Sequence, residues 1–150
     1  MRRRSIYFTI QRSKLIPMMM LFDWPEHLVS IGQRPVTTSA PQALMFMNNA
    51  AAREYAKGFG TILRKRVRDK QKPKDDQSKD KQRDYQPAIK FAYESAYGRP
   101  ATDEELALSE DFIAEQVAIY VAEESKAAEL AALTDFAQMI LSGNEFVFVR

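Results

Sequence analysis

Asp23, Glu26 and His27 form the one cluster in the sequence whose side chains could carry out acid–base chemistry. A histidine beside carboxylates can move a proton to or from a substrate. Here Pro25 lies inside the cluster, and polar side chains are ordinary in such turns. We therefore interpret residues 23–27 as a surface turn rather than a catalytic site.

The cysteine and histidine counts exclude several kinds of site. The chain has no cysteine and a single histidine, His27. Disulfides, thiolate metal ligands, cysteine nucleophiles and multi-histidine metal sites are therefore excluded. The sequence also has no glycine-rich phosphate loop, no GxSxG elbow and no HExxH helix. We predict no catalytic, cofactor-binding or metal-ligating residue in this chain.

Charge is divided unevenly along the 150 residues. The net charge is +5 over residues 1–63, +5 over residues 64–84 and −8 over residues 85–150. Either the basic and acidic parts face each other within the molecule, or the basic part meets an anionic partner. We favour the first reading, because two parts of one chain attract each other at high effective concentration.

The first half of the chain predicts an irregular segment and then one long helix. Residues 1–38 are apolar, interrupted by prolines, and too broken for a signal peptide or a membrane span. A helix over 39–67 begins with a capping box of Ser39 and Gln42, with Pro41 in its first turn. Gly58 and Gly60 would let another helix approach closely. The predicted buried face consists of Leu44, Met47, Ala51, Tyr55, Phe59, Ile62 and Leu63.

Residues 68–84 predict a charged flexible linker. Lysine, arginine and aspartate dominate the segment, and Pro73 stops any helix. A tail that binds nucleic acid is the alternative. Interleaved aspartates and the absence of an aromatic residue from this run disfavour it, so we do not expect nucleic acid as a partner.

Residues 85–150 predict an acidic helical part. Asp84 and Pro87 would open its first helix, and Gly98 with Pro100 would end it. A second capping box, Thr102 with Glu105, starts the next helix. Its predicted inner face comprises Leu106, Phe112, Ile113, Val117, Tyr120 and Val121.

A last helix is predicted from Ser125 to Gly143. Its inner face would consist of Leu130, Leu133, Ala137, Ile140 and Leu141. The apolar tail after it would dock on the bundle or continue into the surface of a missing partner. The whole reads as an all-α domain of about four main helices in a small bundle, with an irregular N-terminal segment and a disordered charged loop.

Four polar residues outside the helix caps could each have either a structural role or a ligand-binding role. Asn48 and Asn49 lie mid-helix, where we expect an inward amide to bind the backbone of residues 15–35 rather than a ligand. Arg34 precedes a helix start and pins a loop or binds an anion there. Arg99 pairs with Glu105 or with helix-end carbonyls, or binds an anion.

Several short motifs occur in the order found in one family. They are RRSIY at 3–7, FD at 22–23, Arg34, TTSAPQAL at 37–44, NN at 48–49, YGRPATDEEL at 97–106 and SGNEFVFV at 142–149. This pattern resembles the C-terminal domain of large planctomycete proteins known as Domain of Unknown Function 1553. The motif residues are Asp23, Arg34, Thr38, Pro41, Gln42, Asn48, Asn49, Gly98, Arg99, Pro100, Glu105, Asn144, Glu145 and Phe146.

The resemblance implies a longer protein of the cell envelope or of the secreted fraction. Similar chains often carry a planctomycete-type cytochrome c domain upstream, so any haem would belong to that region; this chain has no CxxCH motif. We expect residues 1–150 to be a truncated C-terminal domain whose partners are the upstream domains or another protein. Many family members place a cysteine before the arginine that corresponds to Arg34, and this chain does not.

Three functions follow as hypotheses. The first is a structural or interaction domain without catalysis of its own. The second is a domain that lends residues, with Asp23, Arg34 and Asn48 as first suspects, to a larger polysaccharide-related or redox enzyme. The third is a nucleic-acid binder that uses the basic segment.

Overall fold

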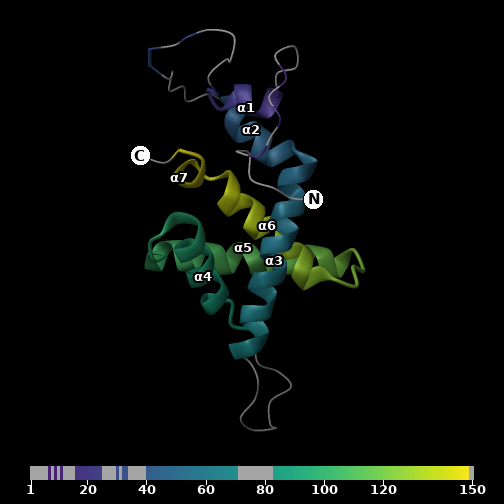
Figure 1. Cartoon of the computed structure of the whole chain (residues 1–150). Helices are drawn as coiled ribbons and strands as arrows, with labels where there is room; N and C mark the ends of the chain where they lie inside the picture. The colour runs from purple at the N-terminus through teal and green to yellow at the C-terminus, as the bar shows by residue number, and fades with distance from the viewer. Residues whose placement is uncertain are drawn as a thin grey trace, which may run out of the picture. The chain divides into compact units, whose positions relative to one another are not determined.

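The computed structural model describes residues 7, 9, 11, 16–24, 30, 32–33, 40–70 and 83–148. The chain divides into two compact units, residues 1–42 and residues 43–150. Within the described ranges every regular element is a helix, so the predicted all-α fold is confirmed (Figure 1). The helices are α1 (Pro17–Leu21), α2 (Ala40–Asn48), α3 (Ala50–Lys70), α4 (Gln86–Tyr97), α5 (Asp103–Ala122), α6 (Ala128–Ser142) and α7 (Asn144–Val147).

The first unit contains the short helix α1, which Pro17 begins with a backbone already fixed for a helix. After α1 the chain turns at Asp23, whose φ is +56°, and the Trp24 N–H donates to the Met19 carbonyl at 3.0 Å. Gln42 is 1% exposed, and its Nε2 donates to the Leu21 carbonyl at 2.8 Å. Ser39, the other half of the predicted capping box, lies outside the described residues.

The helix predicted as one over 39–67 is two, because it is interrupted at Asn49. The Asn49 Oδ1 accepts a hydrogen bond from the Ala51 N–H at 2.7 Å and so caps α3. The predicted role of Asn48 and Asn49 is therefore wrong: the Asn48 amide donates to the Leu44 carbonyl in its own helix. The amide that binds the backbone of residues 15–35 belongs to Gln42.

The predicted buried face of α3 is confirmed at Leu63, and Phe59 packs partly buried against the core, but most of the face that is buried consists of other residues. Leu63 and Val67 are fully buried, together with the small residues Ala52, Ala56 and Gly60. Most of the predicted inner face instead lies outward and forms what we call the outer apolar stripe. Its members are 48–58% exposed: Leu44, Met47, Tyr55 and Ile62.

Close approach of α6 explains this choice of face. A Cβ atom placed on Gly60 would lie 3.0 Å from the backbone N and Cα of Thr134 in α6. A face of alanine and glycine lets two helix backbones approach in this way, whereas leucine and tyrosine would hold them apart. The predicted close approach is confirmed at Gly60, while Gly58 faces open space.

Helix α6 is the centre of the second unit, packed against α3, α4, α5 and α7. It supplies Leu133, Phe136 and Ile140 to a core completed by Ile89 of α4 and Ile113 of α5. In Figure 1, α5 runs across the direction of α3. The predicted inner face of α6 is confirmed at Leu133, Ala137 and Ile140.

Several predicted boundaries and one face need correction. Helix α6 begins at Ala128 rather than Ser125, and α4 begins at Gln86, where the Asp84 Oδ1 accepts from the Gln86 N–H at 3.0 Å. Val121, predicted to face inward, is 62% exposed. Helix α3 continues to Lys70, so the first three residues of the predicted linker 68–84 belong to this helix. The centre of the predicted linker, residues 71–82, lies outside the described residues.

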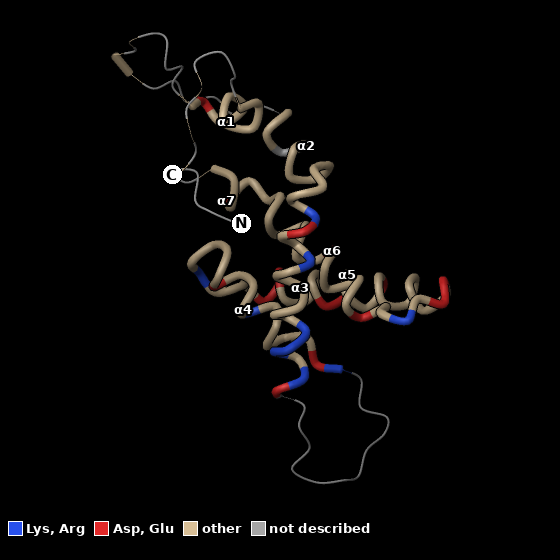
Figure 2. The backbone as a smooth tube through the Cα atoms, turned by 45° about the vertical axis from the view of Figure 1, so that its right-hand side comes forward, with Lys and Arg blue, Asp and Glu red and all other residues tan. Residues whose placement is uncertain are grey.

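Ion pairs join the basic and acidic parts of the chain, as the first reading of the charge pattern predicts. Arg53 pairs with Asp135 at 2.6 Å, and Arg64 pairs with Glu129 at 3.1 Å. Figure 2 shows basic residues along the C-terminal half of α3 and acidic residues on α5. Among the described helices, none combines the length and apolar character needed to cross a bilayer.

Candidate functional site: the Arg99 cluster

Two caps position Arg99 between α4 and α5. Gly98 takes a left-handed conformation with φ of +70°, which ends α4 and which favours glycine. Thr102 begins α5 with a capping box: its Oγ1 accepts from the Glu105 N–H at 3.2 Å, and the Glu105 Oε2 accepts from the Thr102 N–H at 2.8 Å. Both caps were predicted and both are confirmed. They hold Arg99 on a short, fixed connection.

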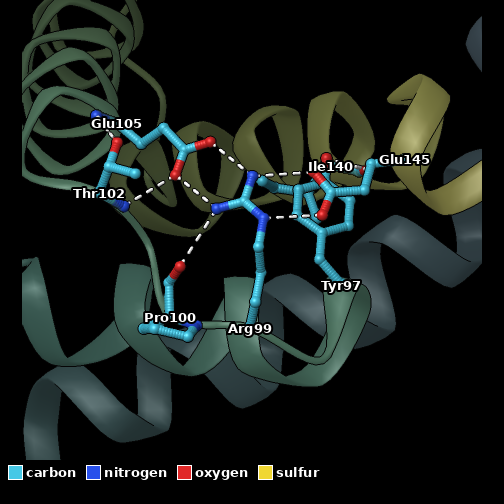
Figure 3. Close-up of polar contacts among 7 residues, drawn as sticks. All are labelled: Tyr97, Arg99, Pro100, Thr102, Glu105, Ile140 and Glu145. Atoms are coloured by element: carbon cyan, nitrogen blue, oxygen red, sulfur yellow. Dashed lines mark hydrogen bonds and ion pairs between the residues drawn. The ribbon is translucent and has the colours of Figure 1, made fainter.

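All five N–H groups of the Arg99 guanidinium have acceptors within the chain (Figure 3). Nη1 donates to Glu105 Oε2 at 2.8 Å and to the Pro100 carbonyl at 3.1 Å. Nη2 donates to Glu105 Oε1 at 2.7 Å and to Glu145 Oε2 at 2.8 Å. Nε donates to Glu145 Oε1 at 2.7 Å. The guanidinium thus forms a bidentate pair with each of two carboxylates, one on α5 and one on α7. We call Arg99, Glu105 and Glu145 the Arg99 cluster.

Two tyrosines flank the cluster. The Tyr93 and Tyr97 rings meet edge to face at 5.3 Å, and the Arg99 guanidinium lies 5.6 and 5.7 Å from their centroids. The Tyr97 hydroxyl donates to the Ile140 carbonyl near the end of α6 at 3.0 Å. A Cβ atom on Gly143 would lie 2.5 Å from this hydroxyl, so only glycine leaves room for the bond.

The charges of the cluster are fixed near neutral pH. Hydrogen bonding from Arg99 lowers the pKa of Glu105 to about 2 and also lowers the pKa of Glu145. Hydrogen bonding to Glu105, and then to Glu145, raises the pKa of Arg99. Burial raises the pKa of Tyr97 to about 12. No group in the cluster is poised to exchange a proton near pH 7, as a general acid or base would have to be.

The sequence was compared with models of known protein families, and one of them matches most of the chain. Residues 1–113 match the family model described as PSD1, protein of unknown function (DUF1553). The chain belongs to the DUF1553 family. The match includes Arg99, Pro100 and Glu105 and ends before Glu145. No curated protein and no solved structure matches the chain.

The structure brings together part of the motif set of this DUF1553 chain. Arg99, Pro100, Glu105 and Glu145 converge, with Gly98 shaping the approach. Phe146 docks through an edge-to-face contact with Phe46 at 6.1 Å, which confirms docking for this member of the predicted C-terminal tail.

The other motif residues lie elsewhere in the chain. Asp23, Pro41 and Gln42 belong to the first unit, and Arg34 and Thr38 lie outside the described residues. Asn48 and Asn49 lie at the break between α2 and α3, and Asn144 begins α7. In the described part of the chain, no three histidine or acidic side chains are grouped as a metal site requires.

Sequence reasoning missed two sets of contacts in this DUF1553 domain. The pairing of Glu145 with Arg99 spans 46 residues, and nothing local signals it. In a second network, the Tyr120 hydroxyl donates to Asp135, which pairs with Arg53, and Gln138 Nε2 donates to the Met47 carbonyl at 2.8 Å. The one sequence feature that could have indicated this network is the position of Gln138 three residues after Asp135 in the middle of a predicted helix.

Proposed function

We propose that this domain is a structural and interaction module, without catalysis of its own, of a planctomycete-type secreted or envelope protein. The observation that supports this most is the saturation of Arg99, whose five donors are all engaged by the chain itself. An arginine that binds a substrate keeps donors directed at open space. Here the motif arginine instead ties the α4–α5 connection to α7.

Replacing Arg99 by glutamine tests this role through stability. The variant leaves the Glu105 and Glu145 carboxylates close together without a cation; because these pairs are partly exposed but bidentate, we expect the melting temperature at pH 7 to fall by a few degrees. Arg68→Gln is the matched control, because among the described residues Arg68 has no ion pair and its loss should leave the melting temperature nearly unchanged.

The pH dependence gives the Arg99→Gln test a second readout. The pKa of Glu105 is lowered in the folded state, from 4.5 to about 2, so its contribution to stability is complete above pH 4.5 and is lost as pH falls through 2. The melting-temperature difference between wild type and variant should shrink over this window. An Arg99→Gln protein as stable as wild type at pH 7 would refute the structural role.

The outer apolar stripe supports the interaction half of the proposal. Exposed leucine, methionine and isoleucine side chains along α2 and α3 are typical of a surface that another protein or another domain covers. Ile62 is 48% exposed, whereas its neighbour Leu63 is fully buried.

The pair Ile62 and Leu63 tests whether the stripe belongs to the domain's own core. We expect Ile62→Gln to change the free energy of unfolding by no more than about 0.5 kcal/mol. Leu63→Ala should lower it by about 2–5 kcal/mol, because it opens a cavity between α3 and its neighbours. Chemical denaturation measures both values. A large loss in Ile62→Gln would place the stripe in the core and remove it as an interaction surface.

A further inference from the structure

A half-open hollow of about 300 Å³ lies on the second unit, away from the Arg99 cluster. It is lined by the C-terminal half of α3, the residues just before α4, the end of α5 and the start of α6. Four cationic side chains line it: Arg64, Arg68, Arg83 and Lys126. Its volume is at the lower end of the roughly 300–1,000 Å³ range of small-molecule sites.

The acid in the hollow accounts for only part of this positive charge. Glu129, whose side chain is 10% exposed, pairs with Arg83 and, at 3.1 Å, with the Nε of Arg64. One buried carboxylate thereby holds two guanidinium groups in place. Among the described residues, Arg68 and Lys126 have no ion pair, so the lining carries a surplus of positive charge without a counter-charge.

The start of α6 adds to the same potential. Ala127 occupies the N-cap position and offers no side-chain acceptor, unlike Thr102 at the start of α5. Ala127 and Ala128 line the hollow, so the positive end of the α6 dipole, which has no side-chain cap, adds to its potential; Glu129 in the first turn offsets part of this. Val117 and Val121 add an apolar wall to the lining.

We propose that this hollow binds a small ligand that carries a phosphate or sulfate group. Arginine donors held by Glu129, a lysine and a helix N-terminus are the groups that recognise such oxyanions. The apolar wall would contact the remainder of the ligand. A half-open hollow of this size, with one buried acid in its lining, suits a small molecule better than a polymer, which would need an extended basic groove.

Calorimetric titration of the full chain with inorganic pyrophosphate and with sulfate, at low ionic strength, tests the proposal. We expect saturable binding of one anion per chain. The double variant Arg68→Gln, Lys126→Gln should weaken this binding by roughly a hundredfold, since it removes two charged hydrogen bonds and each costs about a factor of ten. Both side chains are exposed, so the fold should persist, which circular dichroism checks.

The matched control is Lys57→Gln, Lys65→Gln, which removes the same charge from exposed positions of α3 outside the hollow and should leave the affinity unchanged. Equal weakening by both double variants would mean diffuse attraction and would overturn the proposal, as would the absence of saturable binding. Tighter binding to short single-stranded DNA or to anionic vesicles, reduced by either pair, would replace it with a polymer or membrane surface.

Discussion

Replacing Gly60 by leucine should lower the free energy of unfolding by about 2–3 kcal/mol, among the largest effects of any single change outside the central core. A Cβ at this position lies 3.0 Å from the Thr134 backbone, which cannot rotate away as a side chain can. Helix α3 must therefore move from α6, and contacts of Leu63 and Phe136 loosen with it. Urea denaturation monitored by circular dichroism measures the loss.

Gly58→Leu is the control for this prediction. Gly58 lies in the same helix two residues earlier, and a Cβ there meets nothing within 4 Å. Removing a helix-interior glycine at an open position should raise the free energy of unfolding by about 0.5–1 kcal/mol. Opposite signs at the two glycines would confirm that α6 packs directly on Gly60; equal effects would contradict that packing.

Replacing Gly143 by alanine should lower the free energy of unfolding by about 1–3 kcal/mol. The new Cβ would lie 2.5 Å from the Tyr97 hydroxyl and displace it from the Ile140 carbonyl. The backbone itself tolerates alanine, since φ at Gly143 is −65°. The cost therefore arises from the lost hydrogen bond and from shifted packing of the Tyr97 ring against Tyr93.

A double-mutant cycle with Tyr97→Phe isolates this cause. Without the hydroxyl, the alanine at position 143 has less to displace, so the two changes together should cost less than the sum of the single changes. Chemical denaturation of the four proteins gives the coupling. Strict additivity would show that Gly143 and the Tyr97 hydroxyl act independently, contrary to the geometry described here.

Local signals predicted local structure well. Gly98 ends α4 and the Thr102–Glu105 box begins α5 where the sequence indicated, because the residues of each cap are close in the chain and satisfy each other. The pairing of Arg99 with Glu105 spans only six residues and was predicted on the same grounds. The first part of the candidate site was thus available from sequence.

Which of its two faces α3 buries could not be predicted from local sequence signals. Helix α3 has an alanine–glycine face and a face of larger apolar residues, and periodicity favours the larger ones. The small face wins because it lets α6 approach closely at Thr134, a residue 74 positions beyond Gly60. The pairing of Glu145 with Arg99 was not predicted for the same reason, since the two residues lie 46 positions apart in the sequence.

The central place of α6 has a consequence for the synthesis of this protein on the ribosome. Helix α3 buries its inner face mainly against residues 128–142, which are translated long after it. During elongation the inner face of α3 therefore lacks the helix that buries it, and it is exposed together with the outer apolar stripe. Such distant contacts slow folding and expose apolar surface to aggregation. A nascent chain paused before residue 128 should bind chaperones, and completion of α6 should release it.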